Sequence, residues 1–134
     1  MRKFATIIAL ITLSISASFS AFASNDLYNE KTNKYESLKT KVAAANSSDW
    51  NTPFVAAQIC LTDLENMSEA YLWIEQSIKA QETVENRTLK GDYFALYGLD
   101  QLAFNEYQKA LDLQIANGHE DFSALQNKIQ ALGK

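Results

Sequence analysis

The residue types that most often carry catalysis or bind metals are few in this 134-residue chain. His119 is the only histidine and follows Asn117-Gly118 directly, without a second acid–base group beside it. A general base needs a partner within hydrogen-bond reach, so this position indicates an exposed imidazole at a turn. Cys60 is the only cysteine, and no Cys/His group has the spacing of a metal site. We therefore predict neither a metal centre nor a cofactor.

Motifs for covalent catalysis and for phosphate binding are missing as well. The sequence contains neither a G-x-S-x-G nucleophile turn nor a glycine-rich phosphate loop. Carboxylates are plentiful, and two short stretches hold several close together, which favours a solvated helix surface over an acid–base pair. Those carboxylates are Asp63, Glu65, Glu69, Glu82 and Glu85. The sequence therefore predicts a protein that is not an enzyme.

The first two dozen residues have the pattern of a secretory signal peptide. The basic pair Arg2-Lys3 precedes the apolar run Phe4–Leu13, and Ala21-Phe22-Ala23 offers a cleavage site before Ser24. The alternative is a membrane anchor, but this run is shorter than the roughly 20 apolar residues that span a bilayer. We expect residues 1–23 to be removed and the protein to be periplasmic or secreted.

The remaining residues, 24–134, predict one acidic domain. Without Arg2 and Lys3, ten basic residues stand against sixteen acidic ones, a net charge of −6. This charge argues against nucleic acid or an anionic membrane surface as a partner, because both attract a basic face. A single cysteine excludes a disulfide-stapled scaffold. Its neighbours, Ile59 and Leu61, favour a small buried side chain for Cys60 over a reactive or dimer-forming thiol.

Hydrophobic spacing predicts an all-α fold of six helices, because apolar residues recur every three or four positions and no stretch alternates at period two. Thr52 followed by Pro53 predicts a helix N-cap and first helical residue, and Asn117-Gly118 predicts a helix end. Leu64 and Tyr97 are among the residues expected on the apolar faces. We expect helices over Asn25–Ala45, Pro53–Glu65, Glu69–Gln81, Glu85 to about Tyr97, from the turn Gly98-Leu99-Asp100 to about Asn117, and Phe122–Leu132.

A 33-residue period relates two of these helices. The segment Met67–Gln81 returns in altered form as Asp100–Gln114. A period in the low thirties that keeps side-chain size and polarity predicts stacked helical repeats, here with units of about 51–83 and 84–117. The first and last helices would then cover the ends of the stack. The matched pairs include Ala70 and Ala103, Ile74 and Tyr107, and Ser77 and Ala110.

The second unit resembles a tetratricopeptide repeat. Its first helix carries a small residue and then an aromatic one, a glycine marks the turn, and its second helix has small–large–small spacing. These residues are Gly91, Phe94, Gly98, Ala103, Tyr107 and Ala110. The first unit is similar but weaker, since Gln58 replaces the small residue. The resemblance implies a short solenoid of stacked helix hairpins with an extra N-terminal helix and a C-terminal capping helix. The alternative is an irregular six-helix bundle.

The resemblance also implies a binding surface. In this family the first helix of each unit lines a concave face that binds extended peptides or helices. The positions carried over are Thr52, Val55, Ile59 and Thr62 in the first unit, and Glu85, Thr88, Asp92 and Ala95 in the second. These residues form a mildly acidic, partly apolar groove without the Lys and Asn that clamp a peptide's C-terminal carboxylate. They favour a neutral or basic protein or peptide partner, with self-association as an alternative.

The leading hypothesis for function is therefore a small exported adaptor or assembly factor that binds a protein partner. The alternative is an inhibitor or immunity-type protein that neutralises an exported enzyme or toxin, which the small size, acidity and helical build also suit. An enzyme ranks third, because the sequence offers no catalytic group of residues.

Overall fold

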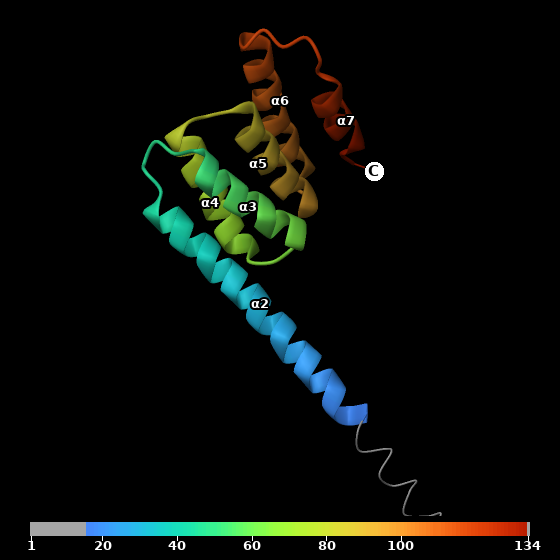
Figure 1. Cartoon of the computed structure of the whole chain (residues 1–134). Coiled ribbons are helices and arrows are strands. Elements are labelled where there is room, and N and C mark those ends of the chain that lie inside the picture. Colours follow the sequence, from blue (N-terminus) through green and yellow to red (C-terminus); the bar gives the residue numbers. More distant parts are fainter. Residues whose placement is uncertain (1–15, 134) are drawn as a thin grey trace, which may run out of the picture. The chain divides into compact units, whose positions relative to one another are not determined.

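The computed structural model describes residues 16–133, with side chains described from Asn29 onward. All regular structure in this part of the chain is α-helical, which confirms the predicted fold class (Figure 1). Five of the six helices begin within two residues of their predicted starts. The helices are α2 (Ser16–Ala44), α3 (Asn51–Asp63), α4 (Met67–Ala80), α5 (Val84–Leu96), α6 (Asp100–Ala116) and α7 (Ser123–Ala131).

The predicted signal peptide, residues 1–23, lies mostly outside the described residues. The exception is its last part, because α2 begins at Ser16 rather than at the predicted Asn25. Within the described region, none of the helices is both long and apolar enough to cross a bilayer.

The chain forms two compact units, Met1–Thr40 and Lys41–Lys134, and the helices α3 to α7 all belong to the second. Within this second unit, α3 packs along α4 and α5 packs along α6, as Figure 1 shows. Smaller contacts join α4 to α5, α6 to α7 and α3 to α5. The turn between α5 and α6 passes through Gly98, whose φ of 66° favours glycine.

Helices α5 and α6 approach each other closely at Gly91. Gly91 of α5 faces the ring of Tyr107 of α6 so tightly that a Cβ there would lie 2.3 Å from Tyr107 Cε1. Ala103 and Ala110, one turn to either side, are fully buried, and Leu125 of α7 completes this core cluster. The small–large–small spacing of α6 therefore acts as expected, since two small residues admit the neighbouring helices while one ring fills the space between them.

The predicted cap of α3 is wrong. The helix begins at Asn51, and the side chain that holds its first turn is Asp49. Asp49 Oδ1 accepts hydrogen bonds from the backbone N–H groups of Asn51 and Thr52, each at 3.0 Å, and Oδ2 accepts one from Thr52 Oγ1 at 2.6 Å. A carboxylate so placed satisfies the unpaired donors of a first helical turn, which a threonine inside that turn cannot do. These hydrogen bonds, chiefly the one from the Thr52 side chain, lower the pKa of Asp49.

Three positions differ from the predicted apolar faces. Leu64 is 65% exposed because α3 ends at Asp63 and Leu64 adopts a left-handed conformation with φ of 55°, which turns it off the buried stripe. Tyr97 is 54% exposed because it follows the last residue of α5. Trp73 of α4, which lies off the predicted apolar stripe, is only 6% exposed and belongs to the core.

A buried polar network joins α3, α4 and α5. The Asn86 side chain is fully buried, and its Nδ2 donates to Ser77 Oγ at 3.1 Å and to the Gln81 carbonyl at 2.8 Å. Its Oδ1 accepts from the Thr83 backbone N–H at 2.9 Å, while Ser77 Oγ donates to the Trp50 carbonyl at 2.7 Å. Because each of these groups finds a partner, the network fixes the connection between α4 and α5 without an orphaned amide.

An ion network links α5 to α6 on another side. Glu106 is buried and pairs with Arg87 at 2.7 Å and Lys109 at 2.9 Å. Lys90 lies 3.9 Å from Glu106 and pairs with Glu75 of α4 at 2.6 Å. Burial by itself would raise the pKa of Glu106, but the hydrogen bonds from Lys109 and Arg87, together with the charge of Lys90, lower it overall. Glu106 is therefore ionised and paired inside the fold.

Candidate functional site

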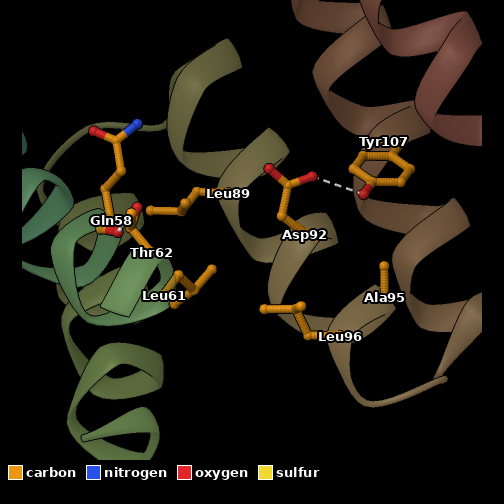
Figure 2. A pocket seen from close by; sticks show the side chains of 8 residues that line it. All are labelled: Gln58, Leu61, Thr62, Leu89, Asp92, Ala95, Leu96 and Tyr107. Carbon is orange, nitrogen blue, oxygen red and sulfur yellow. Dashed lines mark hydrogen bonds between the residues drawn. The ribbon is translucent and has the colours of Figure 1, made fainter. Parts of the chain in front are cut away.

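A hollow of the second unit lies between α3 and α5 (Figure 2). It has a volume of about 490 Å³, within the range of pockets that hold small ligands or side chains. Helix α3 contributes one wall, α5 the opposite wall, and α6 a single aromatic ring. The lining residues are Gln58, Leu61, Thr62, Leu89, Asp92, Ala95, Leu96 and Tyr107.

A second pocket, of about 280 Å³, adjoins the first, because the two share Gln58, Leu89 and Asp92. Its walls come from α3, α5, α6 and α7, and Lys128 of α7 stands at its edge with Glu85 of α5. We call the two pockets together the α3–α5 groove.

The α3–α5 groove brings together five of the eight residues predicted for the binding face. Thr62, Asp92 and Ala95 line the larger pocket, while Glu85, Thr88 and again Asp92 line the smaller one. The remaining three line neither pocket. They are Thr52, Val55 and Ile59.

The difference lies in which stripe of α3 faces α5. Thr52 donates hydrogen bonds to Asp49 at the start of α3 and lines neither pocket. The stripe that lines the groove instead runs through Gln58, Leu61 and Thr62. Their spacing of three and four residues is visible in the sequence, but only the packing of α3 against α4 and α5 decides which stripe lines the groove.

Sequence reasoning also missed Leu89, Leu96 and Tyr107 as lining residues of the groove. Leu89 and Leu96 lie three residues before and four residues after Asp92, so one face of α5 presents a carboxylate between two leucines. This spacing could have identified both leucines as lining residues. Tyr107 comes from another helix, and no sequence pattern indicated that it would line the groove.

Asp92 is the one carboxylate that lines both pockets of the groove. Its Oδ1 accepts a hydrogen bond from Tyr107 Oη at 2.8 Å and pairs with Lys128 Nζ at 2.7 Å. Three helices thus converge on one carboxylate whose side chain remains 31% exposed. Burial raises the pKa of Tyr107, and the hydrogen bond to Asp92 and its negative charge raise it further, so this hydroxyl remains a donor at all physiological pH values.

One buried acceptor faces no donor. Gln114 of α6, which lines the smaller pocket, has a buried Oε1 that accepts no hydrogen bond from the described residues. A buried acceptor without a hydrogen bond destabilises the fold, because its lost hydration is not replaced. A bound partner that donates a hydrogen bond to Gln114 Oε1 would remove this destabilisation.

The groove is lined by groups that form apolar, hydrogen-bonding and ionic contacts. Its lining combines leucine side chains, amides, hydroxyls and one well-held carboxylate. His119 is exposed in the connection before α7, and Cys60 is buried in α3, so neither lines the groove. Within residues 16–133, no group of three or more His, Cys, Asp and Glu side chains could hold a metal ion.

Comparison with known proteins finds no family model that matches this chain, no similar protein of described function and no similar solved structure.

Proposed function

We propose that this chain is an exported, non-catalytic protein–protein interaction module, an adaptor or assembly factor that binds a segment of its partner in the α3–α5 groove. The observation that carries the proposal is a groove that joins leucine side chains, of which Leu96 is exposed, to one positioned carboxylate. Small apolar areas with a few well-placed polar groups are typical of sites that recognise a peptide segment.

The charge of the groove favours a neutral or basic partner. Two carboxylates, Glu85 and Asp92, line it against the single ammonium of Lys128. The whole chain is acidic as well, with a net charge of −4 at pH 7. A basic segment would therefore associate faster than an acidic one, and its advantage would shrink as salt screens the charges.

A tetratricopeptide-like stacking of the pairs α3–α4 and α5–α6 is part of the proposal. It is supported by the contact of α3 with α5 and by the tight approach of Gly91 to Tyr107. In such a stack the first helices of the two units lie side by side and form one continuous surface. The α3–α5 groove is where this surface would be.

Two exposed leucines make a matched test. Leu96 lines the larger pocket and is 54% exposed, whereas Leu72 of α4 is 62% exposed and lines neither pocket. With a photo-crosslinking residue at Thr62, the partner is captured from the producing cell's envelope or medium, identified and purified. Its dissociation constant is then measured for Leu96→Asp and for Leu72→Asp.

We expect Leu96→Asp to weaken binding at least tenfold, because it puts a charge where apolar surface is buried, and Leu72→Asp to bind as the wild type does. Exposed substitutions of this kind change stability little, which circular dichroism verifies for both variants. Equal loss of affinity in the two variants, or none in either, would place the interface elsewhere.

A second candidate function is an inhibitor or immunity-type protein. The observation that favours it is an exposed apolar turn between α5 and α6, formed by Leu96, Tyr97, Leu99 and Leu102. A protruding apolar turn suits insertion into an enzyme's cleft. If the captured partner is a hydrolase or toxin, loss of its inhibition by Leu99→Asp would identify this second function.

A further inference from the structure

The larger pocket of the α3–α5 groove combines an apolar wall with one oriented carboxylate oxygen. Leu61, Leu89 and Leu96 supply the apolar surface. Figure 2 shows Asp92 reaching in from α5 with one oxygen bonded to Tyr107 and the other turned toward α3. This second oxygen, Oδ2, faces the space that a partner would enter.

The carboxylate is held in place before any partner arrives. Both donors that reach it, Tyr107 Oη and Lys128 Nζ, bind Oδ1, at 2.8 and 2.7 Å. Tyr107 is itself buried against Gly91, so it cannot swing away. A pre-oriented acceptor spares a bound partner the entropy of ordering it.

Building on the proposed function, we propose that this pocket takes one lysine side chain of the partner segment. The aliphatic stem lies along Leu61 and Leu96, and the ammonium donates to Asp92 Oδ2. Lysine matches both parts of the pocket, because its four methylene groups bury on apolar surface while its head stays at a polar group. The volume of about 490 Å³ leaves room for the backbone on either side of that lysine.

The geometry favours lysine over arginine. An arginine gains most from a carboxylate when its planar fork binds both oxygens at once. Here Oδ1 already accepts from two groups, so only Oδ2 is open to a partner. An ammonium is a compact charge that one oxygen can satisfy. The adjoining smaller pocket, with Glu85 at its edge, would receive the residues that follow the lysine.

Titration of the full, nitrogen-15-labelled chain with three blocked peptides tests the inference. The peptides are acetyl-Leu-Lys-Leu-amide and its norleucine and arginine counterparts, and the readout is the shift of the amide signals of Thr62, Asp92 and Leu96. Norleucine has the apolar stem of lysine without the ammonium. The variant Asp92→Asn removes the charge but keeps an oxygen for Tyr107, and Asp112→Asn, on the exposed side of α6, is its matched control.

We expect the lysine peptide to bind roughly tenfold more tightly than the norleucine peptide, as befits a hydrogen bond to a charged group, and at least as tightly as the arginine peptide. Asp92→Asn should abolish the preference for lysine, and Asp112→Asn should retain it. Equal shifts with lysine and norleucine would overturn the lysine inference and leave segment binding in the groove intact. A peptide that shifts signals only outside the pocket would also overturn it, whereas the proposed function is decided separately by Leu96→Asp.

Discussion

Gly91→Ala tests the packing of α5 against α6, because this packing decides whether the substitution raises or lowers the stability of the protein. A glycine-to-alanine change inside a helix ordinarily stabilises a protein by about 0.5–1 kcal/mol, because alanine loses less backbone entropy on folding. At this position the new Cβ would lie 2.3 Å from Tyr107 Cε1 and 2.5 Å from Cδ1, closer than side-chain carbons approach in proteins. The ring cannot yield cheaply, because it is buried and its hydroxyl is bound to Asp92.

Overpacking of a well-filled core costs about 1–3 kcal/mol, which exceeds the gain in helix propensity. We therefore expect Gly91→Ala to lower the free energy of unfolding by about 1–2 kcal/mol. For a domain of this size that corresponds to a fall in Tm of roughly 5–15 °C, measured by circular dichroism at 222 nm or by urea titration.

A double-mutant cycle tests whether contact with the Tyr107 ring causes the loss of stability in Gly91→Ala. Tyr107→Leu destabilises the protein by itself, but it removes the atoms that the new Cβ would meet. In that background Gly91→Ala should cost nothing or should stabilise by about 0.5–1 kcal/mol. A single variant Gly91→Ala as stable as the wild type, or the same loss in both backgrounds, would refute the close approach of α5 and α6.

Three further predictions follow from the same structure. N-terminal sequencing of the exported protein should find Ser24 first, and a mature chain that retains residues 1–23 would refute the signal peptide. Asn86→Ala should cost about 1–3 kcal/mol in urea unfolding, because it leaves the buried Ser77 hydroxyl and the part-buried Gln81 carbonyl without a donor; a cost below about 0.5 kcal/mol would contradict the network. Because the pKa of Glu106 is lower in the fold than its ordinary value of 4.5, its stabilisation is present above that pH and is lost as the pH falls through the folded pKa. Glu106→Gln should thus be less stable than the wild type at pH 7, with a gap that narrows toward pH 3, and a constant gap would show that the charge is not the cause.

The helices were predictable from the sequence because their signals are local. Each amphipathic stripe repeats within one helix, and Gly98 and Gly118 mark turns by their backbone freedom alone. The burial of Ala103, Tyr107 and Ala110 was predictable for a related reason, since the 33-residue match preserved their sizes.

The polar parts of the core were not predictable, because their signal is not periodic. Asn86 forms a capping box with Thr83 at the start of α5, a local pattern that marks a helix start but does not indicate burial. The contact with Thr83 belongs to this box, whereas Ser77 of α4 meets Asn86 only when α4 and α5 are packed. The same holds for Glu106, whose charge is tolerated inside the fold only because Arg87 and Lys109 reach it.

The surroundings of Asp92 in the α3–α5 groove could be predicted only in part from local sequence patterns. The sequence predicted that Asp92 shares one stripe of α5 with Thr88 and Ala95, and all three line the groove. It could not show that Tyr107, 15 residues later, and Lys128, 36 residues later, would both bind the same oxygen of that carboxylate. Yet these two contacts decide the chemistry of the site, since they hold Oδ1 and turn Oδ2 toward α3. A carboxylate that looked like a general source of negative charge is, in the folded protein, a directional acceptor with one open position.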